Sequence, residues 1–192
     1  MIGNDIIDIA YTKSTTDYRR KGYLEKIMNT SEQKVIRESS EPFFLTWRLW
    51  SMKEAGYKIH VNKTSNRVYN PTQLHCHIID DIHGKVIIEG HKYFTHSKLN
   101  ENYIFTQASE SPPRDMQSKV LILDKVDYQH QRQSCYSALL SAIGEKRKIN
   151  KKKLKVAKNS IGKPEVYFGL SKLDINVSLT HHGRYGAFSF GY

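Results

Sequence analysis

One stretch of ten residues decides the fold prediction for this chain: Leu49-Trp50-Ser51-Met52-Lys53-Glu54-Ala55-Gly56-Tyr57-Lys58. At helical spacing Phe43, Trp47 and Trp50 share one face, and Glu54 takes the next position on that face. A carboxylate that continues an apolar stripe loses hydration, so it needs a cation, a metal or a hydrogen-bond donor beside it to stay ionised. The alternative interpretation is a surface helix on which Glu54 and Lys58 form an ordinary ion pair.

Two further segments place polar side chains where strands usually carry apolar ones. The first, residues 2–9, is rich in β-branched residues but contains Asp5 and Asp8, a residue type that strands disfavour. The second, residues 175–183, alternates as a strand does. One of its faces carries Ile175, Val177 and Leu179, and the other carries Asn176, Ser178 and Thr180. Hydroxyl groups and the imidazole of His181 therefore gather near a strand end, where donors can meet an anion.

Together these segments resemble the 4′-phosphopantetheinyl transferases, enzymes that move phosphopantetheine from coenzyme A to a serine of a carrier protein. The family motifs are Gly-x-Asp, Trp-Ser-x-Lys-Glu-(Ala/Ser)-x-x-Lys, Gly-Lys-Pro and Ser-x-(Ser/Thr)-His. They stand here as Gly3-Asn4-Asp5, the block from Trp50 to Lys58, Gly162-Lys163-Pro164 and Ser178-Leu179-Thr180-His181. The Trp-Ser-x-Lys-Glu block is specific, and the joint occurrence of all four motifs carries the resemblance.

The resemblance implies a magnesium-dependent phosphoryl transfer and a role for each motif residue. Asp5 and Glu54 would hold magnesium, an ion that prefers carboxylate oxygens. Glu54 would also be the base for the carrier serine, and Lys58 would neutralise the departing adenosine 3′,5′-bisphosphate. The residues implied to contact coenzyme A phosphates are Lys53, Thr180, His181 and Arg132. For Arg132 a plain surface charge is the simpler interpretation.

One position departs from the pattern of the larger members of this family, those that activate surfactin synthetase. They carry a second acid two residues after the aspartate, and here that position is Ile7. Two protein carboxylates, with water completing the octahedron, should therefore hold the metal. Asp8 should not replace the missing acid, because on a strand it faces away from Asp5.

The distribution of motifs predicts an α+β protein of two similar halves that pack as a pseudo-dimer with antiparallel sheets. The first half is expected over residues 1–110 and the second over 119–192, separated by the polar, proline-containing segment 109–115. Helices are expected at about 17–37, 43–60 and 128–144. Strands are expected at 2–9, 74–79, 86–88, 103–106, 120–123 and 175–182. Residues 151–158, rich in lysine, are expected to be a solvated loop or helix face.

The order of the motifs is reversed relative to the surfactin-type enzymes, in which the histidine-bearing half comes first. A circular permutation, with segment 109–115 joining the original ends, would explain this order. The rival explanation is an enlarged holo-acyl-carrier-protein synthase, whose motifs follow the order found here. Because one chain carries both surfaces of the site, we expect a monomer with one coenzyme A bound at the junction of the halves.

The net charge of +11 and the isoelectric point near 9.5 agree with anionic ligands. Coenzyme A carries about four negative charges, and an acidic carrier protein would be attracted by the same basic surface. A basic nucleic-acid-binding protein is the competing class, although no nucleic-acid-binding motif is present. A transferase-like protein that binds carrier proteins without activity is a third possibility.

The sequence also bears on cellular location, on the state of the cysteines and on a possible second metal site. It contains no recognisable secretory signal or membrane segment, so we expect a cytoplasmic protein without a membrane partner. Cys76 and Cys135 should be reduced thiols. His75-Cys76-His77 could suggest a metal site, but on a strand the two imidazoles share a face while the thiol points away. Strand packing is the preferred interpretation of that tripeptide.

Overall fold

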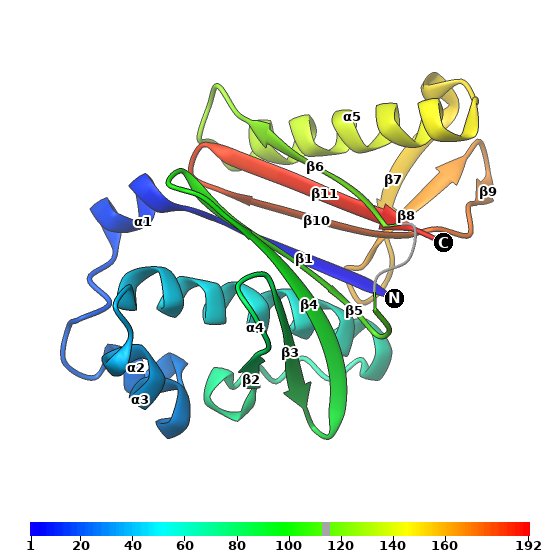
Figure 1. Ribbon diagram of the computed structural model, residues 1–192. Coiled ribbons are helices and arrows are strands. Elements are labelled where there is room, and N and C mark those ends of the chain that lie inside the picture. The colour runs from blue at the N-terminus through cyan, green and yellow to red at the C-terminus, as the bar shows by residue number, and fades with distance from the viewer. Residues whose placement is uncertain (113–115) are drawn as a thin grey trace.

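A computed structural model describes residues 1–112 and 116–192, and its strands form three antiparallel sheets in that part of the chain (Figure 1). The five-stranded sheet has the order β1 (Ile2–Asp8), β5 (Tyr103–Ser109), β4 (His91–Leu99), β3 (His83–Ile88) and β2 (His75–Ile78). A second sheet has the order β10 (Asn176–His182), β11 (Tyr185–Gly191) and β6 (Gln117–Ile122). The third consists of β7 (Leu154–Lys158), β8 (Pro164–Phe168) and β9 (Ser171–Lys172).

The helices are α1 (Ile9–Thr15), α2 (Tyr23–Ile27), α3 (Thr30–Glu38), α4 (Pro42–Thr64) and α5 (Tyr128–Arg147). Their starts follow from local chemistry. Asn29 and Glu32 form a reciprocal capping box at α3, and Asp127 accepts a hydrogen bond from the His130 amide at α5. Pro42 occupies the first turn of α4, where its missing N–H costs nothing.

The helices and the three antiparallel sheets together confirm the predicted α+β class.

Segment 17–37 is mainly helical, as predicted: α2 and α3 make up most of it, and the extended cap residues Met28 and Asn29 separate the two helices. Two other local features were not predicted correctly. Strand β4 was not predicted, since its buried face carries Tyr93, Thr95 and Ser97 rather than a run of aliphatic residues. The lysine-rich segment is neither loop nor helix throughout: a 3-10 turn at Lys151–Lys153 leads into β7, whose Leu154 is buried.

Each long helix covers one sheet. Figure 1 shows the central strands running between α5 above and α4 below. Helix α4 packs on the five-stranded sheet through a core that includes Met52, Ala55 and Ile59. Helix α5 packs on β10 and β11 through Leu139 and Ile143. The hydrophobic effect thus builds two separate cores, one under each helix.

Strand β1 fits unusually close against α4 because Gly3 has no side chain. A Cβ atom at this position would lie 2.1 Å from the backbone carbonyl oxygen of Ala55, far inside van der Waals contact. The glycine of the Gly-x-Asp motif therefore lets the strand that carries Asp5 approach the helix that carries Glu54.

The two main sheets meet where β1 lies beside β10. The backbone amide of Asn4 donates to Ser178 Oγ at 3.0 Å, and the Asn4 amide side chain donates to the Ser189 hydroxyl at 3.2 Å. A small apolar cluster that contains Ile6 and Tyr185 seals the same junction. Side chains rather than a backbone ladder join the sheets here, so the junction can accommodate polar groups.

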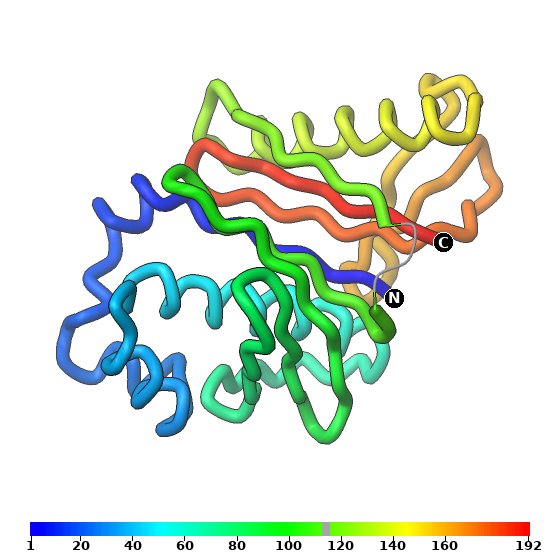
Figure 2. The backbone as a smooth tube through the Cα atoms, in the orientation of Figure 1, coloured from blue at the N-terminus to red at the C-terminus, as the bar shows by residue number. Residues whose placement is uncertain are grey.

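The two chain ends, the end of β5 and the start of β6 lie at one edge of the molecule (Figure 2). Ile2 pairs with Ser109 and Gln117 pairs with Phe190, so the connection leaves β5 next to the start of the chain and enters β6 next to its end. This geometry is what a circular permutation requires. Residues 113–115 of the predicted boundary lie outside the described residues, and the division into two domains and the permutation both stay predictions.

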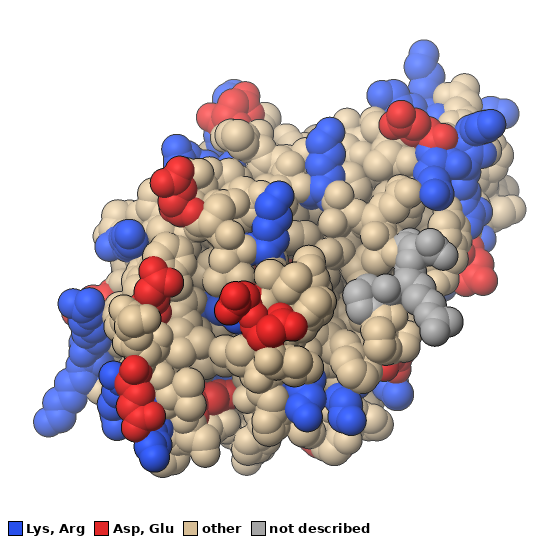
Figure 3. Space-filling model, viewed as in Figure 1, with Lys and Arg blue, Asp and Glu red and all other residues tan. Residues whose placement is uncertain are grey.

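Lysine and arginine are unevenly spread over the surface. On the face shown in Figure 3 they gather over the end of α5 and the β7–β9 sheet. In the described residues no helix combines the length and the apolar character needed to cross a bilayer.

Candidate active site

Asp5 lies on β1 with its carboxyl group turned toward β10 and α4. The Thr180 hydroxyl donates to Asp5 Oδ1 at 3.3 Å, and the Lys58 ammonium lies 3.8 Å from the same oxygen. The other oxygen, Oδ2, is buried and has no hydrogen-bond partner in the described residues. Burial raises the pKa of Asp5, while Lys58 and the Ser51 hydroxyl oppose that rise. A buried carboxylate oxygen without a partner is a position that a cation would fill.

Glu54, which α4 carries, lies close to Asp5 of β1. Burial and the negative charge of Asp5 both raise the pKa of Glu54. The Tyr69 hydroxyl faces this carboxyl group and lowers the pKa of Glu54, although it makes no hydrogen bond of good geometry within the described residues. A carboxyl group whose ionisation is opposed by a neighbouring acid provides the electrostatic setting in which a divalent cation binds.

Lys58 reaches the same place from one turn further along α4. Its ammonium donates to the backbone carbonyl of Asn4 at 2.6 Å and is partly exposed. It also lowers the pKa of His181, as does the burial of that imidazole. One cation therefore borders both the acid pair and the strand end that carries the histidine.

Lys53, expected to contact a phosphate, lies elsewhere, and that expectation is corrected. Its side chain is fully buried, and its ammonium is 2.6 Å from Glu32 Oε2. It also donates to the carbonyl oxygens of Ile27 at 2.9 Å and Pro71 at 2.7 Å. All three ammonium hydrogens are used, so this side chain has nothing left to offer a ligand.

Two hollows meet at His181. One of about 360 Å³ contains Asp5 and Glu54 and is lined by aromatic residues. Its full lining is Asp5, Ile6, Ile7, Thr12, Thr16, Tyr23, Trp47, Trp50, Glu54, His181 and His182. The other, of about 190 Å³, is lined by Tyr128, Arg132, Cys135, Tyr136, Lys158, Pro164, Leu179 and His181. The acid pair and Pro164 of the Gly-Lys-Pro motif thus line two different hollows that have His181 in common.

The remaining predicted site residues have distinct surroundings. Thr180 is buried and uses its hydroxyl on Asp5. Arg132 is exposed, lies over the Tyr136 ring at 5.0 Å and borders the smaller hollow. Asp8 is buried and engaged elsewhere, since its carboxyl group accepts from the backbone amides of Tyr11 and Arg184. The structure brings Asp5, Glu54, Lys58, Thr180 and His181 together and leaves Lys53 outside.

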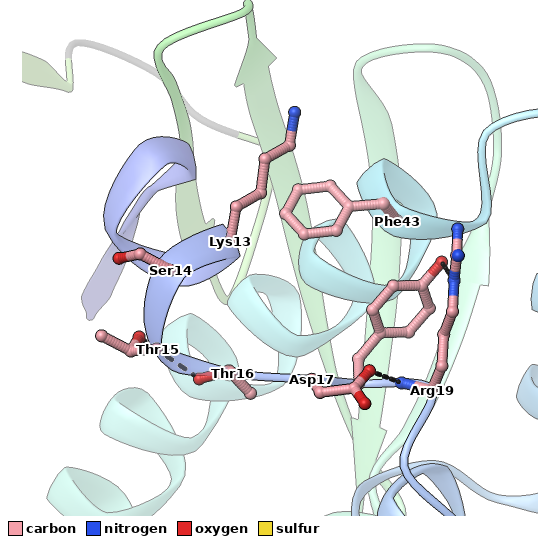
Figure 4. Close-up of a pocket in the computed structure, with 8 residues that line it drawn as sticks. Lys13, Ser14, Thr15, Thr16, Asp17, Arg19 and Phe43 are labelled. Atoms are coloured by element: carbon pink, nitrogen blue, oxygen red, sulfur yellow. Dashed lines mark hydrogen bonds between the residues drawn. The ribbon is translucent and has the colours of Figure 1, made fainter.

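A wider, open hollow of about 710 Å³ adjoins the acid-containing one, and Thr16 lines both. Figure 4 shows Lys13 extending beside the ring of Phe43, with its ammonium 5.2 Å from the ring centroid. Arg19 also lines this hollow. The approach to the acid pair therefore has a cationic border.

The acid pair fits a magnesium ion with few protein ligands. No group of three or more histidine, cysteine, aspartate or glutamate side chains that could hold a metal occurs in residues 1–112 and 116–192. Two carboxylates, one with a buried free oxygen, suit magnesium, which commonly retains several waters and also binds substrate phosphates. His75, Cys76 and His77 form part of strand β2, as expected.

Comparison with known families gives the class of this protein. The model of the 4′-phosphopantetheinyl transferase superfamily matches residues 1–111, more than half of the chain. The chain belongs to the 4′-phosphopantetheinyl transferase superfamily. Its members use coenzyme A and act on carrier proteins, so this superfamily member is a transferase of the phosphopantetheinyl type. Among curated proteins none matches the chain in sequence.

Two residues of this candidate active site, Tyr69 and Ser51, were given no role by the sequence analysis. Tyr69 lies in a segment with no recognised motif, and its hydroxyl is placed by the path of the chain after α4. Ser51 was quoted as part of a motif but given no role, and its hydroxyl lies near Asp5. For Tyr69 and Ser51 the sequence offered no direct indication of a role. The periodic spacing of Trp47 and Trp50 indicated only which helix face carries Glu54.

Proposed function

We propose that this protein transfers 4′-phosphopantetheine from coenzyme A to a serine of an acidic apo carrier protein, with magnesium as cofactor. The observation that carries the proposal is the pairing of buried Asp5 with half-buried Glu54, two acids with raised pKa values beside a partly exposed lysine. Superfamily membership supports the reaction class. The geometry supports the division of roles among the residues.

Asp5 and Glu54 are the proposed magnesium ligands. The bound ion would neutralise pyrophosphate oxygens of coenzyme A and so make the phosphorus easier to attack. Thr180 holds Asp5 Oδ1 at 3.3 Å, and Gly3 sets the closeness of β1 to α4. These contacts preorganise the acid pair before any ligand enters.

Glu54 is the proposed general base. The hydroxyl oxygen of the carrier serine forms a bond to the phosphorus that bears pantetheine, and its proton passes to the Glu54 carboxylate directly or through one water. The bond from that phosphorus to the adenosine 3′,5′-bisphosphate oxygen breaks, and the electron pair leaves with the bisphosphate. Lys58, about one turn along α4, is placed to offset the charge of this leaving group.

The two hollows that share His181 suit the two ends of coenzyme A. The smaller, bordered by Tyr128, Pro164 and Lys158, would hold the adenosine end, with His181 and Arg132 as phosphate contacts. The larger, lined by Trp47 and Trp50, would hold the reacting phosphate and the start of the pantetheine arm. A phosphate at His181 would favour the protonated imidazole and reverse the lowered pKa of the ligand-free protein.

The basic surface would steer both substrates. Net charge is +11, and the border of the open hollow next to the acid pair includes Lys13 and Arg19. An acidic carrier protein would meet this border before its serine reaches Glu54. Since one chain supplies both walls of the site, we propose a monomer that binds one coenzyme A.

The decisive experiment incubates the protein with purified apo carrier proteins, coenzyme A and magnesium and follows the intact mass of each carrier. Addition of one phosphopantetheine group, lost when magnesium is chelated, is the expected result. Stable binding of a carrier protein without any mass increase, over a panel of fatty-acid, polyketide and peptide carriers, would instead support an inactive carrier-binding protein.

A further inference from the structure

Tyr69 occupies a position that the proposed mechanism does not use. It lies between α4 and the 3-10 turn at Pro71–Gln73. Its ring packs on Tyr57, with centroids 4.5 Å apart, and edge-on to Trp50 at 6.0 Å. Trp50 and Tyr57 lie one turn before and one turn after Glu54, so the Tyr69 ring lies across the helix face that carries this acid.

The Tyr69 hydroxyl is buried and lacks a hydrogen-bond partner of good geometry in the described residues. The packing of its ring against Trp50 and Tyr57, which flank Glu54 on α4, puts this hydroxyl on the side of the helix that carries the Glu54 carboxyl group. A phenol keeps its proton at neutral pH, so toward a carboxylate it can act as a donor. A buried hydroxyl without a partner costs free energy, and a small adjustment of Glu54 would recover it.

The segment that carries Tyr69 is fastened to the residue next to Glu54. The ammonium of Lys53 donates to the Pro71 carbonyl at 2.7 Å and binds Glu32 at 2.6 Å. Glu32 in turn accepts the Cys76 amide at 2.9 Å, which ties the start of β2 to the same point. The chain from Pro71 to Cys76 is thus held against α4 by a buried ion pair, and Tyr69 lies two residues before it.

We infer that Tyr69 is a positioning residue for Glu54: its hydroxyl donates to the Glu54 carboxylate and keeps that carboxylate aimed at Asp5, and the Lys53–Glu32 pair holds Tyr69 in place. This inference rests on the proposed function, because it needs Glu54 as a metal ligand. Carboxylate ligands are commonly held by such outer hydrogen bonds, whose loss lowers metal affinity by about 10–100-fold.

The test compares Tyr69→Phe with Tyr57→Phe in the full chain. Each variant removes one hydroxyl and keeps its ring, but only Tyr69 has a fully buried, unpartnered hydroxyl facing Glu54. The probe is Mn²⁺, a spectroscopic stand-in for magnesium, titrated by electron paramagnetic resonance in the presence of coenzyme A and without carrier protein. Thermal melting of each metal-free variant reports whether packing has changed.

We expect Tyr69→Phe to weaken Mn²⁺ binding by about tenfold or more, with unchanged melting temperature and unchanged coenzyme A affinity. Tyr57→Phe should match the wild type in all three measurements. Wild-type Mn²⁺ affinity in Tyr69→Phe, in a preparation whose wild-type protein binds the ion and transfers phosphopantetheine, overturns the inference and leaves the proposed function intact. Absence of Mn²⁺ binding by the wild-type protein overturns both.

Discussion

Asn4 and Ser178, which are 174 positions apart in the sequence, share three hydrogen bonds. The Asn4 backbone amide donates to Ser178 Oγ at 3.0 Å, Ser178 Oγ donates to Asn4 Oδ1 at 2.8 Å, and Asn4 Nδ2 donates to the Ser178 carbonyl at 3.3 Å. The next residue along β1 is Asp5, and two residues beyond Ser178 is Thr180, which donates to Asp5. The contact between β1 and β10 therefore fixes the alignment of the proposed metal ligand with the strand that carries His181.

Glu54→Gln should abolish most of the transfer while leaving coenzyme A bound. The substitution removes a proposed metal ligand that is also the base, and losses of one such electrostatic contribution are about 10²–10³-fold in rate. His181 and Lys58 would still contact phosphates. Single-turnover kinetics and calorimetric titration with coenzyme A check the two halves of this prediction. Near-normal turnover would remove Glu54 from the chemistry.

Asp5→Asn should raise the magnesium concentration needed for half-maximal transfer by at least about tenfold, because an amide is a poor replacement for a carboxylate ligand. Asp8→Asn is the matched control on the same strand. Its buried carboxyl group caps α1 and accepts the Arg184 amide, so this change should lower the melting temperature without altering the magnesium requirement. Equal shifts in the metal titration of both variants would show that the strand faces have been misassigned.

Lys53→Met should destabilise the protein by about 3–5 kcal/mol, since it leaves Glu32 buried without its cation. Lys58→Met, which removes a partly exposed ammonium, should cost only about 1 kcal/mol but reduce transfer strongly. Urea unfolding and initial-rate assays separate the two effects. A Lys53→Met protein of unchanged stability and lost activity would mean that this ammonium acts on substrate after all.

Glu54→Gln should stabilise the metal-free protein at neutral pH. The pKa of Glu54 is raised by burial and by Asp5, so the folded state holds this proton more tightly than the unfolded state. Stability from this group is therefore lost as pH rises from its ordinary value, about 4.3, through the raised one, and Gln avoids that loss.

The expected gain is a melting temperature higher by roughly 2–4 °C at pH 7, the shift that about 1 kcal/mol gives in a domain of this size. The gain should vanish in acid, where Glu54 is protonated in both states. Glu165→Gln is the control of opposite sign, because hydrogen bonding to Lys172 lowers the pKa of Glu165. It should not stabilise the protein, and a gain of equal size there would refute the linkage argument.

Light scattering should give the mass of one chain, and calorimetry should give one coenzyme A per chain. Both walls of the proposed site come from the same polypeptide, with Asp5 and Glu54 on one side and His181 on the other. An obligate trimer with sites between chains would contradict this prediction without changing the reaction.

Sequence reasoning succeeded where a residue's role depends on its own pattern. The alternation in residues 175–182 correctly separated Val177 from Ser178 and Thr180. In the structure Val177 lies in the core under α5, while Ser178 and Thr180 bind β1. The aromatic stripe correctly put Trp47, Trp50 and Glu54 on one helix face, and in the structure all three line the same hollow. In both cases periodicity alone determines which side chains share a face.

Prediction from the sequence failed where the role of a residue depends on a partner that is distant in the sequence. Lys53 was expected to face a ligand because of its place in a motif, but Glu32, which lies 21 residues earlier, neutralises it inside the protein. Nothing local distinguishes a buried lysine from a solvated one. Strand β4 was missed for a related reason: its buried Ser97 is satisfied by Thr106 on β5, so no apolar alternation was needed.

Gly3 also affects the proposed metal site through the distance between β1 and α4. The contact of this glycine with Ala55 determines how far β1 stands from α4, and each of these elements carries one of the two acids. Magnesium accepts oxygens at about 2.0–2.1 Å and calcium at about 2.3–2.6 Å, so a change of spacing by a fraction of an ångström changes which ion fits. The absence of a side chain at Gly3 thus helps to determine which cation radius the site prefers. Gly3→Ala should increase the distance between β1 and α4 and shift the preference toward larger cations.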